Sequence, residues 1–186
     1  MRSFLEKILM LSLLFFVNAA AWAVSFDANL DFTVKGKKYT SKLYYADDRS
    51  RQNVRNDMGE EEILIVRKDL KKMWYLDPNL KTYYERPFDL NVPASIGIFD
   101  AIKNRAKETL IGTEKINGHE VEKYLIEIDS KDRKIQFYAW RKPGEQVPLK
   151  VMDVKNIVTF EYSDVNYREQ DKSLFELPAG IKKAER

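Results

Sequence analysis

Hydrophobic and polar positions alternate with a period of two over most of this chain. Residues 25–34 are the clearest case, because Phe26 and Phe32 stand in a series that alternates with polar residues such as Asp27 and Asp31. A period of two sends successive side chains to opposite faces of a β-strand. This segment is therefore predicted to be a strand with one buried face.

Further strands are expected wherever the pattern repeats between short segments with the composition of turns. They are residues 39–46, 51–57, 63–66, 73–76, 82–85, 109–116, 120–129, 134–142, 147–154 and 156–162. Asn117-Gly118, between two of them, is a strong hairpin signal. The segment 51–57 is so polar that we expect it at an edge of the sheet. About eleven short strands in succession predict a mainly β fold with one antiparallel sheet.

The pattern changes between residues 88 and 107, where the spacing of the hydrophobic residues approaches 3.6. Ile96, Phe99 and Ile102 then fall on one side of a helix, expected over about residues 92–106. A single helix inserted in a series of strands has only the sheet against which to bury its apolar side. We expect it to pack on the concave face of the sheet.

The first 23 residues have the pattern of an export signal. Two basic residues precede an apolar run of about ten residues, 8–17, and the small residues Ala21 and Ala23 follow it. The run is far shorter than the roughly 20 residues that a membrane-spanning helix needs. We expect cleavage after Ala23, which leaves residues 24–186 as a single periplasmic domain.

The composition excludes several kinds of site. The 186 residues include no Cys and one His, and the formal net charge is +3. Without Cys there is no disulfide scaffold, Cys-ligated zinc, iron–sulfur cluster or site for an acyl anchor at the cut. The charge is too small to indicate nucleic acid as a partner. No cofactor and no metal site are expected.

Motifs of catalysis are absent as well. The chain lacks Gly-x-Ser-x-Gly, His-Glu-x-x-His and a phosphate-binding glycine loop. His119 follows a hairpin turn, and no partner that would orient it as a base can be named. We therefore expect no catalytic residues and a protein that is not an enzyme.

Aromatic residues are the most informative part of the composition, at 12% of the chain. Several of them stand close to the expected helix, and two interpretations remain open. They line an apolar pocket between sheet and helix, or they fill a closed core. On alternation and position, the pocket candidates are Leu30, Phe32, Leu43, Trp74, Leu76, Tyr83, Phe99 and Ile102.

Residues 69–78 resemble a motif of the outer-membrane lipoprotein carrier superfamily (LolA/LolB-like), Asp-Gly-Lys-x-x-Trp-x-Tyr-x-Pro. Asp69, Lys71, Trp74 and Pro78 match it, whereas leucines replace the Gly and the Tyr. Two later segments are also similar to motifs of this superfamily. They are the hairpin that begins at Gly112-Thr113-Glu114 and continues to Tyr124, and the Phe-x-x-Pro-x-Gly sequence from Phe175 to Gly180. The likeness is greatest to its periplasmic lipoprotein-sorting branch.

The resemblance implies an antiparallel half-barrel of about eleven strands, with helices that cover acyl chains on its concave face. It thereby implies a soluble periplasmic binding protein for a lipid, an acyl chain or a lipoprotein, held between the sheet and a helical lid. The carriers begin with a long N-terminal helix. Here the first expected strand starts almost at the cleavage site, so that helix is missing.

A second function stays open, that of an envelope interaction or sensor module with a closed core and no ligand. Its partner is expected to be an envelope protein, bound by strand addition along the polar segment 51–57 or through residues 86–107. Small basic clusters, such as Lys182-Lys183, offer a weak attraction to a membrane surface.

Overall fold

The computed structural model describes residues 24–55, 58–88, 106–130 and 133–184, and twelve strands of this part form one sheet. The strands are β1 (Ser25–Val34), β2 (Lys37–Ala46), β3 (Arg49–Arg55), β4 (Glu61–Arg67), β5 (Lys72–Asp77), β6 (Thr82–Pro87), β7 (Lys107–Ile116), β8 (His119–Ser130), β9 (Arg133–Arg141), β10 (Lys150–Asp153), β11 (Val158–Tyr167) and β12 (Lys182–Lys183). A short 3₁₀-helix, η2 (Lys172–Phe175), precedes β12.

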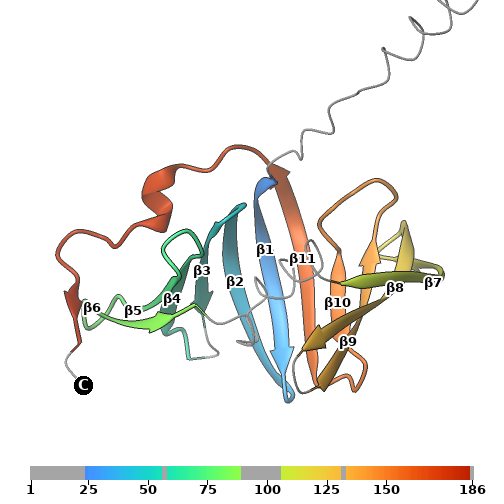
Figure 1. Cartoon of the computed structure of the whole chain (residues 1–186), viewed down its shortest axis with the longest axis horizontal. Helices are drawn as coiled ribbons and strands as arrows, with labels where there is room; N and C mark the ends of the chain where they lie inside the picture. The colour runs from blue at the N-terminus through green and yellow to red at the C-terminus, as the bar shows by residue number, and fades with distance from the viewer. Residues whose placement is uncertain (1–23, 56–57, 89–105, 131–132, 185–186) are drawn as a thin grey trace, which may run out of the picture.

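The strand order is β12-β6-β5-β4-β3-β2-β1-β11-β10-β9-β8-β7. Every pair is antiparallel except β12 with β6, whose parallel pairing covers two residues. The sheet twists so far that β6 and β7 lie almost across the central β1, β2 and β11 (Figure 1), yet it does not close into a barrel. The expected antiparallel sheet is confirmed, with β12 as one strand more than expected.

The turn between β7 and β8 shows why the local sequence predicts this topology well. Asn117 and Gly118 have φ values of 50° and 81°. Two consecutive positive φ angles are the mark of a type I′ turn, whose twist matches that of the strands it joins. The hairpin that Asn117-Gly118 predicts is therefore present.

The sheet buries side chains on both of its faces. On β4, Ile65 and Val66 are adjacent and both buried, but they belong to two separate hydrophobic clusters. Because adjacent residues of a strand point to opposite sides, each cluster occupies one face. We call the face of Val66 the inner face and that of Ile65 the outer face.

The two clusters differ in extent. The inner-face cluster spans nearly the whole sheet, with buried members Val24, Phe26, Ala28, Leu30, Leu43, Tyr45, Val66, Met73, Ile126, Ala139, Val147, Val151, Phe160 and Tyr162. The outer-face cluster is local and consists of Ile63, Ile65, Trp74 and Leu76 on the strands and Phe175 of η2.

The polar segment 51–57 does not lie at an edge, contrary to the expectation. Its described part belongs to β3, which is paired with β2 on one side and with β4 on the other. The strand is tolerated inside the sheet because its polar groups are hydrogen bonded: Gln52 Nε2 donates to Ser41 Oγ at 3.1 Å, and Arg51 Nε to Asn53 Oδ1 at 2.7 Å. The long edge strand is β7, whose residues are exposed from Lys107 to Lys115.

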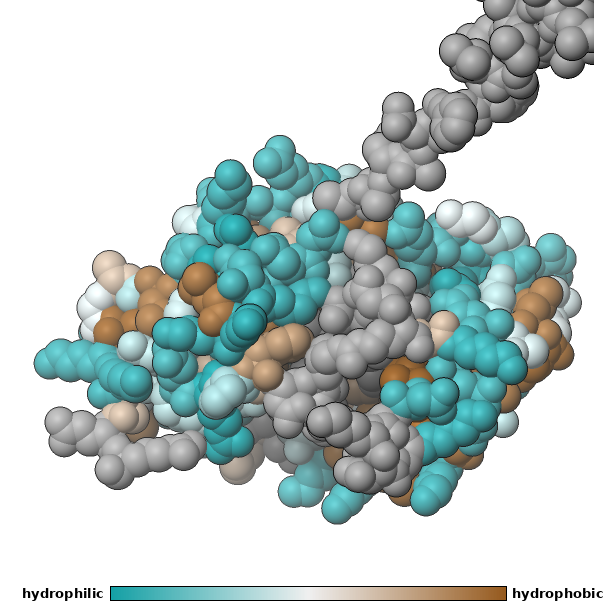
Figure 2. All heavy atoms as spheres, viewed as in Figure 1, coloured by the Kyte–Doolittle hydropathy of each residue, from teal (hydrophilic) through white to brown (hydrophobic). Residues whose placement is uncertain are grey.

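The helix expected over residues 92–106 lies outside the described residues except for Ala106, which packs against the inner-face cluster. Within the described ranges, no helix has the length and apolarity needed to cross a membrane. The visible surface is mostly hydrophilic, with hydrophobic residues gathered toward the two ends of the sheet (Figure 2).

Candidate functional site

The inner face is the candidate site, because it carries the larger of the two hydrophobic clusters of the described structure. Around its buried centre lie half-buried hydrophobic residues that include Phe32, Leu64, Tyr75, Tyr124, Ile128, Phe137, Val158 and Val165. The one helix of the described part, η2, contacts β3 and β4 and packs with the outer-face cluster. In that part of the chain, no helix lies on the inner face.

The residues that the sequence suggested for a pocket divide between the two faces. Leu30, Phe32 and Leu43 lie together on the inner face. The other three described candidates, Trp74, Leu76 and Tyr83, lie in or against the outer-face cluster. Phe99 and Ile102 lie outside the described residues.

This division follows from the register of β5. Trp74 pairs with Ile65, and Leu76 pairs with Ile63, so these side chains share the outer face. The inner face receives Met73 and Tyr75 instead. Because all four residues from 73 to 76 are apolar or aromatic, alternation within the strand could not show which pair points inward.

The outer-face cluster is covered by the chain after β11. Phe175 of η2 is 1% exposed and packs with the buried residues of β4 and β5. The indole of Trp74 also donates from Nε1 to Glu85 Oε2 on β6 at 3.0 Å. A buried indole N–H needs an acceptor, and this hydrogen bond supplies one for Trp74.

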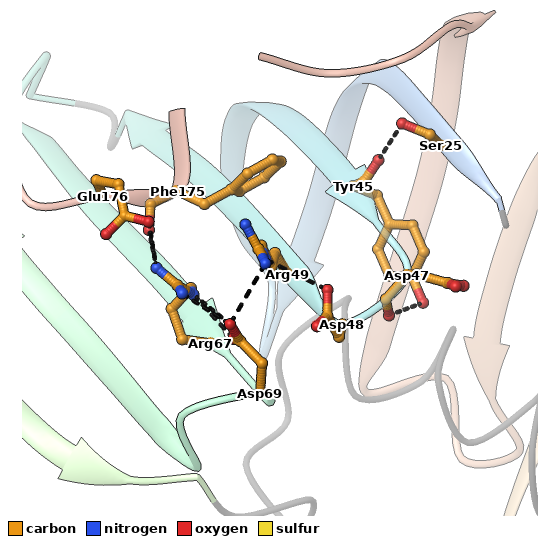
Figure 3. A network of polar contacts seen from close by, with 9 residues as sticks. All are labelled: Ser25, Tyr45, Asp47, Asp48, Arg49, Arg67, Asp69, Phe175 and Glu176. Atoms are coloured by element: carbon orange, nitrogen blue, oxygen red, sulfur yellow. Dashed lines mark hydrogen bonds and ion pairs between the residues drawn. The ribbon is translucent and has the colours of Figure 1, made fainter. Parts of the chain in front are cut away.

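A network of ion pairs anchors the same C-terminal segment (Figure 3). Arg67 of β4 is buried, and its Nη2 lies 2.7 Å from Asp69 Oδ2 while its Nη1 lies 2.5 Å from Glu176 Oε1. Arg49 adds a second cation 3.5 Å from Asp69. The hydrogen bond from Arg67 holds the pKa of the Asp69 carboxyl below its ordinary value, although burial opposes this shift.

Two matching residues of the carrier-like motif therefore have structural roles here. Asp69 is bound to Arg67, and Trp74 is buried under Phe175 on the outer face. Neither of them lies on the inner face. Asp69, through Arg67, and Trp74, through Phe175, are thus linked to the C-terminal segment.

At the β5–β6 end of the inner face, two stacked aromatic rings lie close to one cation. The rings of Tyr75 and Tyr84 have centroids 5.0 Å apart and an interplanar angle of 5°. The guanidinium of Arg86 lies 5.4 Å from the Tyr75 ring and 5.5 Å from the Tyr84 ring. Burial raises the pKa of the Tyr75 hydroxyl, and the charge of Arg86 partly offsets this effect.

At the β8–β9 end, the aromatic and basic groups have acidic partners. Arg141 lies 4.2 Å from the Tyr124 ring and forms an ion pair with Glu108 of β7. The Tyr124 hydroxyl donates to Glu122 Oε2 at 2.6 Å, and this bond raises the pKa of the hydroxyl. The two ends of the inner face thus differ in charge.

A groove of about 510 Å³ crosses the outer face and is lined by Asn29, Asp31, Thr40, Ser41, Lys42, Asn53, Val54, Arg55, Glu61 and Ser163. Its polar lining does not suit an acyl chain, whose transfer from water is driven by apolar contact. Among the described residues, no group of three or more His, Asp or Glu side chains is placed to hold a metal ion.

Comparison with known proteins gives similar structures but no similar sequences. No family model matches the chain, and no curated protein matches it. An uncharacterized conserved protein from Thermus thermophilus has a TM-score of 0.61 at 11% identity, with 89% of this chain and 92% of that chain covered.

Two further solved structures bear family names. A LolA superfamily protein from Nitrosomonas europaea has a TM-score of 0.49 at 11% identity, with coverage of 83% and 91%. An outer membrane lipoprotein-sorting protein domain from Vibrio parahaemolyticus has a TM-score of 0.41 at 12% identity, with coverage of 82% and 89%. The first of these two structures bears the name of the superfamily that the motifs of this chain resemble. At such identities, the likeness concerns the fold alone.

Proposed function

We propose that the domain from Val24 onward is a soluble periplasmic binding protein for a lipid, an acyl chain or a lipoprotein. The ligand would lie against the inner face, beneath a lid formed by residues 92–106. The observation that supports this proposal is the extent of the apolar inner face, which runs from Met73 on β5 to Ile126 on β8. The outer-face cluster is smaller, and η2 packs against it.

The inner face offers an acyl chain what its transfer from water requires. Each buried methylene contributes about 0.8 kcal/mol. Half-buried side chains such as Phe32, Leu64 and Phe137 lie beside fully buried ones, so a chain laid along them would contact apolar atoms continuously. Nothing in this binding requires a cofactor or a chemical step.

The test is to export the full chain in a Gram-negative host and purify the mature protein without detergent. Native mass spectrometry should then find it with bound lipid, and the delipidated protein should take up a fluorescent fatty acid. Protein that is always recovered free of lipid, and that also takes up no fatty acid, would contradict the proposal.

Two adjacent residues of β9 provide a matched pair of variants. Phe137 packs against the inner-face cluster, whereas Tyr138 points to the outer face beside Trp140. Phe137→Ser is expected to weaken fatty-acid uptake severalfold, and Tyr138→Ser to leave it unchanged. Equal effects of the two substitutions would show that the inner face is not the binding surface.

A second candidate function rests on the edge strand β7. In the described sheet it pairs with β8 alone, and its central residues Leu110 and Ile111 are 53% and 47% exposed. An extended segment of an envelope protein could add to such an edge as a further strand. The charged residues Glu108 and Lys115 near its ends would limit unspecific pairing.

Site-specific photo-crosslinking in cells tests this second function. A crosslinker in place of Ile111 should capture one defined envelope protein, identified by mass spectrometry. A crosslinker in place of Leu80, an accessible residue in the turn between β5 and β6, serves as control. No adduct at position 111, or the same adducts at both positions, would count against a partner at β7.

A further inference from the structure

Arg86 is a cation on the inner face without an acidic partner among the described residues. It pairs in register with Met73, a buried member of the inner-face cluster, and its strand neighbour Tyr84 pairs with Tyr75. Glu85, between them, points to the outer face and is bound by Lys72 and Trp74. The contacts of the Arg86 guanidinium are with the two tyrosine rings.

The contacts of Arg86 with the two rings leave its hydrogen-bonding capacity available. A cation–π contact is an attraction between the positive charge and the ring, and it occupies no oxygen acceptor, so the planar set of N–H donors is left for other partners. That planar set of donors fits the two oxygens of a carboxylate or a phosphate. The attraction to the rings of Tyr75 and Tyr84 at the same time favours this position of the cation.

The opposite end of the inner face differs in its charges. Arg141 is the corresponding cation there, and Glu108 neutralises it while Glu122 lies in register beside it. An anionic headgroup would meet Glu108 and Glu122 at that end. At the β5–β6 end, Asp77 and Glu62 also occupy inner-face positions, but each stands four residues along its strand from Met73 or Val66, which lie level with Arg86, and no described carboxylate pairs with Arg86. The charges therefore favour an anionic headgroup at the β5–β6 end of the inner face over one at the β8–β9 end.

We propose that Arg86, beside the rings of Tyr75 and Tyr84, is the headgroup site of the inner face, and that the ligand is an amphiphile with an anionic headgroup. Its carboxylate or phosphate would bind Arg86, and its acyl chain would extend over Tyr75 and Met73 toward the centre of the cluster. This inference rests on the proposed function, because it assigns the chemistry of the ligand at the same site.

Three probes with the same oleoyl or oleyl chain test the inference: oleate, oleyl alcohol and oleoyl lysophosphatidic acid. For the wild-type protein, at least one of the two anions should bind about tenfold more tightly than the alcohol, because hydrogen bonds to charged groups are the stronger ones. A preference for oleate indicates a carboxylate ligand, and a preference for the lysophospholipid indicates a phosphate ligand. Arg86→Gln should abolish the preference, because it should weaken binding of the preferred anion about tenfold more than binding of oleyl alcohol.

Arg55→Gln is the matched control. Arg55 is an exposed cation on β3 that lines the outer-face groove, so its substitution changes the net charge equally. It should retain the preference for the anion. A preference that survives Arg86→Gln, or equal affinities of the wild-type protein for all three probes, would overturn the headgroup site alone. Failure of all three to bind would overturn the proposed function and this inference with it.

Discussion

Arg67 of β4 is hydrogen bonded to Glu176, 109 residues later in the chain, at 2.5 Å (Figure 3). The same guanidinium donates to both carboxylate oxygens of Asp69 through Nε, and to Phe175 O through Nη1. One buried side chain thereby connects the end of a strand to the segment that covers the outer face.

Replacement of Arg67 by Ala is expected to lower the free energy of unfolding by about 2–4 kcal/mol. The substitution leaves Asp69 partly buried without its main partner, and breaking a buried pair on one side is costly. Urea unfolding followed by tryptophan fluorescence measures the difference. Glu176→Gln is the control: its side chain is 54% exposed, so it should cost less than about 1 kcal/mol. Equal losses for both variants would contradict the burial argument.

Acid should remove the stabilisation that Asp69 contributes. Its pKa is held below the ordinary value of 3.8, so the folded state binds fewer protons than the unfolded chain. The contribution is complete well above pH 3.8 and is lost as the pH falls through the lower pKa of the folded state. The free-energy difference between wild type and Asp69→Asn should therefore shrink from neutral pH to about pH 3. A difference that does not change with pH would show that the Asp69 charge contributes nothing.

Asp27, on the outer face of β1, should also make the free energy of unfolding decrease in acid. Burial alone would raise its pKa, but hydrogen bonds and charges of Lys42 and Arg168, at 2.8 and 2.6 Å, outweigh burial and lower it. As for Asp69, the stabilisation is present at neutral pH and disappears in acid. Asp27→Asn should reduce the slope of unfolding free energy against pH below about pH 5. An unchanged slope would contradict this assignment.

Phe32→Ala and Leu76→Ala should separate ligand binding from stability. Phe32 is half-buried on the inner face and stacks on Tyr39 with centroids 5.0 Å apart, so its loss should weaken fatty-acid binding. Leu76 is 3% exposed on the outer face, and its truncation should cost about 2–5 kcal/mol of stability. Titration well below the unfolding temperature should show unchanged affinity for the folded Leu76→Ala protein. Weakened binding by this variant alone would move the binding surface to the outer face.

Export should remove the first 23 residues. The small residues at Ala21 and Ala23 direct the cut to the bond before Val24, one residue ahead of β1. Intact-mass measurement of the periplasmic protein should give a chain that begins at Val24. Ala23→Phe is expected to block cleavage and leave the longer chain bound to the membrane fraction, and normal processing of that variant would place the cut elsewhere.

Much of the fold could be predicted from local sequence, because alternation and turn chemistry act over a few residues. The β1 pattern and the Asn117-Gly118 turn each specify their own structure without distant contacts. The position of β3 could not be predicted in this way. Its polar composition is typical of an edge, and only hydrogen bonds such as that from Gln52 to Ser41 of the neighbouring strand explain its place inside the sheet.

The candidate site, too, could be predicted from the sequence only in part. For β1, alternation correctly put Leu30 and Phe32 on one face. For β5, both faces are buried, so a continuous apolar run carried no information on direction, and Trp74 lies on the face opposite to Tyr75. The proposed role of Arg86 had no sequence signal, since it depends on which carboxylates lie near it in space.

The sequence by itself determined a mainly β, antiparallel chain with the pattern of an export signal and a likeness to lipoprotein carriers, because these properties follow from local periodicity, turns and short motifs. Only the tertiary structure decided which face each buried residue occupies, which strand forms the long edge, and that Arg141 is paired with Glu108 while no described carboxylate pairs with Arg86. These properties arise from contacts between segments far apart in the chain, such as Phe175 on the outer face of β4 and β5. No pattern within a single segment records them.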